Sequence, residues 1–166
     1  MSKQSFVTSF VVDRAPTEVF DAVTNVRGWW SEEVVGGTER PGDEFDYRYG
    51  DTHRCRIRVT ESVPGRKVSW LVLDNHFSFT EDTAEWTGTT IDFEILERED
   101  GGTELRFTHH GLVPEYECFE VCVQGWSFYV GKSLRSLIAT GVGQPNGGGG
   151  RVRTAAERDL VAARDR

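Results

Sequence analysis

One long segment with helical periodicity, residues 111–141, constrains the fold of this chain most, because it follows a series of segments with strand periodicity. Its apolar residues recur at the spacing of one helix face: Phe119, Cys122, Val123, Trp126, Val130, Leu134 and Leu137. We expect Pro114 to begin this helix and Gly141 to end it. An antiparallel sheet must cover one of its faces, and no other large helix is predicted. The sequence therefore predicts a sheet that packs against a C-terminal helix.

The segments before this helix alternate between apolar and polar residues or are rich in β-branched and aromatic residues, as strands are. The predicted strands lie in residues 5–13, 43–49, 53–61, 63–73, 88–100 and 100–110. Between the first two, a helix is predicted over 15–25, and a break or a short second helix over 26–33. This order of elements predicts an α+β domain.

The two alternating segments in the middle of the chain predict a hairpin with a defined register. A three-residue turn at 50–52 places their apolar faces on the same side of the sheet, whereas a two-residue turn does not. Asp46 then lies across from Arg56, and Glu44 across from Arg58. We interpret this outer face as solvated, with ion pairs between the strands. An anion-binding site at the three arginines of the second strand is the alternative.

Charge and composition exclude several classes of protein. The formal net charge of the 166 residues is −8, which argues against nucleic acid as a partner, because binding phosphates needs a basic face. No apolar run is long enough to span a membrane, and the first residues lack the apolar core of a signal peptide. Three cysteines are too few for a disulfide framework. We expect a cytoplasmic protein with reduced thiols and with no membrane or nucleic-acid partner.

We expect residues 1–141 to form one domain. Residues 142–166 begin with a glycine-rich linker and continue as a segment with few apolar residues, which we expect to be a flexible C-terminal tail outside the core.

The long helix contains Gly125 and Gly131, although an interior glycine costs a helix about 1 kcal/mol relative to alanine. We interpret them as positions where the sheet, or a bound molecule, comes close to the helix. A curved sheet around one helix leaves a gap that large side chains fill only in part, and the aromatic residues of the helix are expected to line it. Ordinary core packing of these aromatic residues is the alternative.

The predicted cavity wall combines inward residues of the last two strands with residues of the helix: Phe93, Phe107, His109, Cys118, Cys122, Trp126 and Tyr129. His109 is the only candidate for catalysis, as a general acid or base, and a hydrogen-bonded core histidine is its alternative role. Cys118 and Cys122, with His109, could also hold a metal or form a redox pair, but apolar thiols in the wall are the favoured interpretation. We expect no metal, because the sequence has no CxxC, no HExxH and no second pair of ligands, and no cofactor, because nucleotide and dinucleotide motifs are missing.

Two further features bear on this cavity. The aromatic segment 74–86 is expected to be a long loop that gates the entrance. Trp29 and Trp30 either close one end of the cavity or fasten the short helices to the sheet.

Several segments resemble a known family. The segment "APTEVFDAVTNVRGWW" resembles the opening of the START-like (SRPBCC, helix-grip) superfamily. "EWTGTTIDFEI", "GGTELRFTHHGLVPEYECFEVCVQGW" and "YVGKSLRSLIATGVGQP" resemble the bacterial branch of the family named for the activator of the ninety-kilodalton heat-shock protein ATPase. The resemblance covers about residues 5–145. It implies a curved antiparallel sheet of six or seven strands around a C-terminal helix, with a hydrophobic cavity between them.

Relatives in the superfamily imply three functions. The first is binding of a small hydrophobic or aromatic molecule in the cavity. The second is an enzyme similar to polyketide cyclases and dehydratases that uses the same cavity, with His109 moving a proton. The third is a protein-binding module similar to a co-chaperone. We expect the third least, because the chain shows neither an exposed apolar patch nor a segment similar to the N-terminal chaperone-binding domain.

Overall fold

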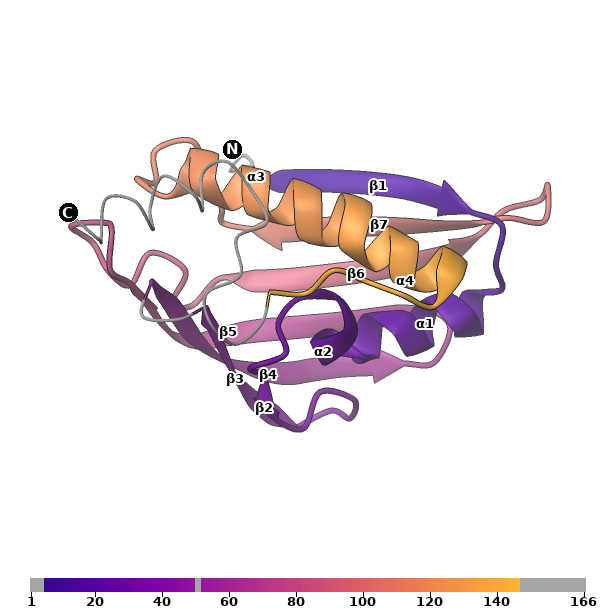
Figure 1. The fold of residues 1–166 in the computed structure, drawn as a ribbon, viewed down its shortest axis with the longest axis horizontal. Helices are drawn as coiled ribbons and strands as arrows, with labels where there is room; N and C mark the ends of the chain where they lie inside the picture. Colours follow the sequence, from indigo (N-terminus) through magenta and orange to yellow (C-terminus); the bar gives the residue numbers. More distant parts are fainter. Residues whose placement is uncertain (1–4, 50–51, 147–166) are drawn as a thin grey trace.

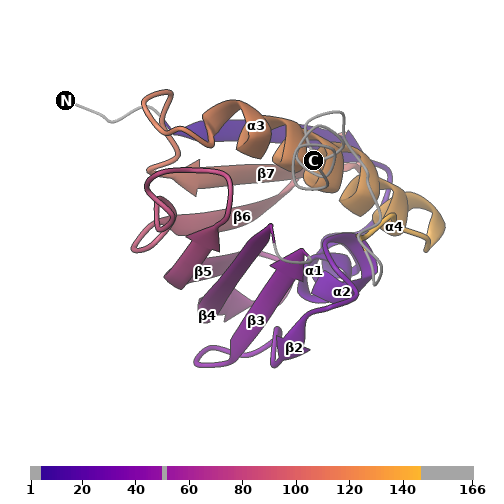
Figure 2. The same cartoon turned by 60° about the vertical axis from the view of Figure 1, so that its left-hand side comes forward.

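Seven strands form one antiparallel sheet in the computed structural model, which describes residues 5–49 and 52–146. Across the sheet their order is β1-β7-β6-β5-β4-β3-β2. Their bounds are Phe6–Val12 (β1), Val35–Gly36 (β2), Glu44–Tyr49 (β3), His53–Val63 (β4), Lys67–Phe77 (β5), Thr90–Glu97 (β6) and Thr103–His110 (β7). The sheet curves around the C-terminal helix, which crosses its concave face (Figures 1 and 2).

The helices are α1 (Pro16–Thr24), α2 (Val26–Trp29), α3 (Phe119–Phe128) and α4 (Arg135–Thr140), and a π-helical segment, η1 (Tyr129–Leu134), joins α3 to α4. The predicted α+β fold is confirmed, with two short helices after the first strand. None of the helices in the described ranges combines the length and the apolar character that crossing a membrane requires.

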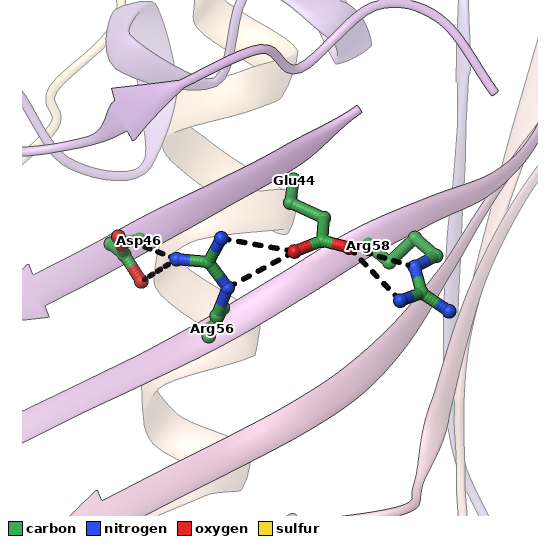
Figure 3. Close-up of polar contacts among 4 residues, drawn as sticks. All are labelled: Glu44, Asp46, Arg56 and Arg58. Carbon is green, nitrogen blue, oxygen red and sulfur yellow. Dashed lines mark hydrogen bonds and ion pairs between the residues drawn. The ribbon is translucent and has the colours of Figure 1, made fainter. Parts of the chain in front are cut away.

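The predicted register of the β3–β4 hairpin is confirmed. Glu44 pairs with Arg58 and Asp46 with Arg56. The guanidinium of Arg56 lies 2.9 Å from Glu44 and 3.1 Å from Asp46, and that of Arg58 lies 2.9 Å from Glu44 (Figure 3). Arg58, and then Arg56, hold the pKa of Glu44 below its usual range by hydrogen bonding to its carboxylate. Two of the three arginines that an anion site would use are therefore already paired with carboxylates.

The core lies between the concave face of the sheet and the helices. Alternate residues of β3 and β4 are buried, as the pattern predicts, and β5 is buried over most of its length. The core contains all five tryptophans of the chain: Trp29, Trp30, Trp70, Trp86 and Trp126. Trp29 fastens α2 to the sheet, because its ring stacks on Trp70 and its Nε1 donates a hydrogen bond to the carbonyl of Val23 at 3.1 Å.

The C-terminal helix starts later than the sequence predicts. It begins at Phe119 instead of Pro114, and the residues before it form turns. The carboxylate of Glu85, from the loop after β5, accepts hydrogen bonds from the N–H groups of Glu117 at 2.8 Å and Cys118 at 3.0 Å. Another segment thus supplies acceptors for free N–H groups at the helix start. The predicted end at Gly141 is confirmed, with φ at 84°.

Strand β5 ends later than predicted. It continues to Phe77, so the aromatic loop runs over 78–89 and not 74–86. Residues 74–77 pair with the start of β4, where Asn75 lies opposite Cys55. Sequence patterns do not predict this extension, because Asp and Asn are poor strand formers. In the structure, the buried Asn75 side chain has hydrogen-bond partners.

The segment 142–146 ends in a buried residue, Asn146, although the prediction assigned it to a linker; Val142 in the same segment is exposed. Asn146 is 1% exposed, and its side-chain amide donates to the hydroxyls of Tyr47 and Tyr129, both at 3.2 Å. Its backbone N–H donates to the carbonyl of Trp30 at 3.0 Å. The ordered domain therefore extends to Asn146 at least. The remainder of the predicted tail, 147–166, lies outside the described residues.

Candidate functional site

A cavity of about 60 Å³ lies between α3 and the ends of β3, β4 and β5. Its wall is mostly aromatic and consists of Trp30, Tyr47, Tyr49, Thr52, His53, Phe77, Phe79, Trp86, Val121, Cys122, Gly125, Trp126 and Tyr129. Among the described residues, no Asp, Glu, Lys or Arg belongs to this wall. For comparison, an engineered apolar cavity that takes up benzene has a volume of about 150 Å³. The cavity is therefore apolar, but smaller than a site preformed around an aromatic ring.

Stacked rings occupy most of the space between the helix and the sheet. Trp30 stacks on Tyr47 with ring centroids 3.9 Å apart, and Trp86 stacks on Trp126 at 5.5 Å. Trp30 and Trp126 connect these two pairs at 5.0 Å. The cavity is the space that this cluster of rings leaves free, so any molecule that enters it contacts tryptophan.

The two helix glycines lie in open surroundings, which differs from the prediction of a close approach by the sheet. A Cβ atom added at Gly125 or at Gly131 would meet no heavy atom within 4 Å. Gly125 belongs to the cavity wall, whereas Gly131 does not. The missing side chain at Gly125 therefore leaves room on the helix side of the cavity.

His53 is the imidazole of the cavity wall. It begins β4, between Tyr49 of β3 and Phe77 of β5. Its Nε2 lies 2.7 Å from Oδ1 of Asn75, and its ring stands 4.7 Å from that of Trp86. Burial lowers its pKa to about 3, so the ring is neutral at neutral pH.

His109 lies deeper and has both ring nitrogens occupied. Nδ1 accepts a hydrogen bond from Nε1 of Trp126 at 3.1 Å, and Nε2 lies 2.8 Å from the hydroxyl of Thr89. That hydroxyl donates to the carbonyl of Trp86, so it accepts from His109, and the proton of the neutral ring sits on Nε2. Burial lowers the pKa of His109 to about 3. A proton added at Nδ1 would face the Trp126 N–H, which is itself a donor.

The two helix cysteines are buried and free. Cys118 precedes the first residue of α3, and Cys122 lies one turn further along and faces the cavity. Burial, followed by the neighbouring Cys118, raises the pKa of the Cys122 thiol well above its usual range, so it is not a ready nucleophile. Within the described residues, no three His, Cys, Asp or Glu side chains are placed to hold a metal ion.

Two carboxylates fasten the 78–89 loop to the start of α3. Glu85, from the loop, accepts the hydrogen bonds of Glu117 and Cys118 described above. The carboxylate of Glu117 in turn accepts from the N–H groups of Glu81 at 3.1 Å and Asp82 at 3.2 Å. We call this arrangement the carboxylate clasp. It joins the two segments that carry Phe79 and Trp86 on one side of the cavity and Val121 on the other.

A family model described as Activator of Hsp90 ATPase homolog 1-like protein matches residues 13–139. The chain belongs to this family. The resemblance noted from the sequence is thereby confirmed. No curated protein sequence matches the chain significantly.

Solved structures with the same fold come from several bacteria. The Aha1 dimer from Colwellia psychrerythraea is 21% identical with a TM-score of 0.67, over 84% of this chain and 99% of that one. MLL2253 from Mesorhizobium loti is 16% identical with a TM-score of 0.66, over 81% and 96%. CalU16 from Micromonospora echinospora is 15% identical with a TM-score of 0.59, over 82% and 76%. At these identities the likeness concerns the fold alone.

The structure separates the seven predicted site residues of this family member into two layers. Three lie on the cavity wall: Cys122, Trp126 and Tyr129. The other four are buried but do not belong to that wall: Phe93, Phe107, His109 and Cys118. Phe107 and His109 contact the ring of Trp126, so they support the wall from behind.

Sequence reasoning missed the sheet side of the cavity. Tyr47 and Tyr49 lie on the predicted inner face of β3, and alternation backward from Cys55 places His53 on the same face of β4. The alternation of the two strands therefore indicated that these three residues face the helix. Trp86 and Phe79 belong to the loop, whose course periodicity does not predict.

Proposed function

We propose that this protein binds a small, largely apolar molecule in the cavity between α3 and strands β3–β5. The observation that carries this proposal is an aromatic cavity wall whose described residues include no charged side chain, with Gly125 on its helix side. Burial of apolar surface against such a wall is favourable, and a charged ligand would lose its hydration without gaining a partner.

The size of the cavity limits the ligand. A single ring exceeds about 60 Å³ of free space, so its entry requires movement of the wall. Phe79 is half-buried and lies in the 78–89 loop, so we expect this part of the wall to move when a ligand enters. The loop is then the gate, as the sequence suggests for this region.

Toluene tests the proposal. We expect saturable shifts of the Gly125 amide and of the indole N–H signals of Trp30, Trp86 and Trp126 in NMR titrations, with a Kd of about 1 mM or tighter, which is about −4 kcal/mol. Gly125→Leu should weaken binding about tenfold, because the new side chain enters the cavity. Gly131→Leu is the matched control on the same helix and should leave binding unchanged. Equal affinities of the two variants, or shifts that do not saturate, would contradict the proposal.

The alternatives receive less support. His109 lies behind the wall with both nitrogens occupied, which leaves the cyclase-like enzyme without the proton-transfer group that the sequence suggested. A co-chaperone role is supported by the family description alone, which refers to the Hsp90 ATPase. The cytoplasmic location remains a prediction.

A further inference from the structure

The proton of the neutral His53 ring can be assigned from its neighbours. The side-chain amide of Asn75 donates from Nδ2 to the carbonyl of Thr83 at 3.2 Å, so its Oδ1 is the atom that faces His53. An amide oxygen only accepts, and therefore Nε2 of His53 carries the proton and donates. Nδ1 then carries a lone pair, and no described residue forms a hydrogen bond with it.

The surroundings of His53 allow this lone pair to discriminate between ligands. The ring is packed among aromatic neighbours, with centroids 5.1 Å from Tyr47, 4.3 Å from Phe77 and 4.7 Å from Trp86. The hydroxyls of Tyr47 and Tyr129 are engaged by Asn146. An acceptor in an apolar wall favours a guest with an N–H or O–H group, because a guest without one leaves the acceptor unpaired after water is displaced.

We propose that His53 is the specificity-determining residue of the cavity, and that the ligand is a neutral single-ring aromatic molecule, of the phenol class, whose O–H donates to Nδ1 of His53. This inference rests on the proposed function and adds a chemical class to it. Anionic aromatics such as benzoate are excluded, because no described residue of the wall offers a cation to pair with a carboxylate.

Phenol and toluene provide a matched pair of probes, since a hydroxyl replaces a methyl group of similar size. In calorimetric or NMR titrations we expect phenol to bind about fivefold tighter than toluene, in line with one neutral hydrogen bond. His53→Phe replaces the imidazole with an apolar ring and removes the acceptor, so the ratio of phenol affinity to toluene affinity should fall to about one. Benzoate should not bind. Tighter binding of toluene than of phenol to the wild-type protein, or an unchanged preference in the variant, would overturn the inference.

A measurement on the unmodified protein covers the case in which His53→Phe fails to fold. In protein labelled with ¹⁵N-histidine, phenol should move the Nδ1 signal of His53 upfield, as expected for a lone pair that accepts a hydrogen bond. His109 is the internal control, because both of its nitrogens are already occupied. Cavity shifts with phenol that leave Nδ1 unmoved would refute the role of His53 but leave the proposed function intact. Absence of binding by both toluene and phenol would remove both.

Discussion

Two neutral histidines on neighbouring parts of one core have different roles because their hydrogen-bond partners differ. Both ring nitrogens of His109 are hydrogen-bonded, Nδ1 to Trp126 and Nε2 to Thr89, and His109 thereby orients a ring of the cavity wall. In His53, only Nε2 is hydrogen-bonded to a described residue, Asn75. Periodicity placed His109 on the inner face correctly, but it could not show that both nitrogens of the imidazole were already hydrogen-bonded.

The lowered pKa of His109 makes stability depend on pH. The folded pKa is about 3 against 6.5 for the free side chain, so the unfolded chain takes up a proton first as the pH falls. The contribution of His109 to stability is complete above about pH 6.5 and is lost progressively between that value and pH 3. We expect the free energy of unfolding to fall by about 1.4 kcal/mol per pH unit below pH 6 from this residue, with a further loss from His53.

Urea denaturation between pH 7.5 and pH 5 measures this effect before most carboxylates titrate. His53→Phe should show a smaller slope than the wild-type protein, because one of the two histidines is removed. A stability that stays constant from pH 6.5 to pH 5 would show that His53 and His109 accept protons as readily in the folded protein as in the unfolded chain.

At the scale of elements, the carboxylate clasp determines where α3 begins and how the 78–89 loop is held. Glu85 is 8% exposed and satisfies two N–H groups, whereas Glu117 is exposed. The loop and the helix start lie far apart in the sequence, so this capping interaction has no local signature. The π-helical segment η1 also makes a contact that has no local signature in the sequence. Ser133 within it donates a hydrogen bond to the carbonyl of Trp29, in a distant element, at 2.8 Å.

Substitution of the clasp residues tests their unequal importance. Glu85→Gln keeps one acceptor oxygen but places an amide where the second is needed, so we expect a loss of about 1 to 2 kcal/mol in the free energy of unfolding. Glu117→Gln is the matched exposed control, and its loss should be about 0.5 kcal/mol or less. Hydrogen exchange should accelerate at the amides of Glu117 and Cys118 in the first variant only. Unchanged protection of these amides would contradict the capping role.

At the scale of the whole molecule, the end of the domain supports the cavity. Asn146 binds the hydroxyls of Tyr47 from the sheet and Tyr129 from the helix. The segment 142–146 therefore closes the gap between the two layers, beyond the predicted boundary at residue 141. The buried Asn146 thus connects the cavity wall to a segment that composition alone identifies as a linker.

Two truncated chains distinguish the domain boundary at residue 141, which composition suggests, from the boundary at Asn146, which the fold shows. We expect a chain that ends at Asn146 to keep the stability of the full chain, because the tail is predicted to lie outside the core. A chain that ends at Gly141 should lose about 2 kcal/mol or more, since Tyr47, Tyr129 and Trp30 lose hydrogen-bond partners. Thermal denaturation of both chains measures the difference, and equal midpoints would restore the boundary at 141.

The sequence by itself determined the features that depend on neighbouring residues. Alternation at Phe45 and Tyr47 against Cys55 and Ile57 determined the hairpin register, since a slip of one residue would expose the apolar face. Tertiary structure alone decided how much space remains beside α3, because that space depends on where Trp30 and Trp86 pack after the sheet has curved. It also decided the role of His53, whose free lone pair follows from Asn75 and Thr83, residues brought to it by strand pairing and by the loop rather than by their positions along the chain.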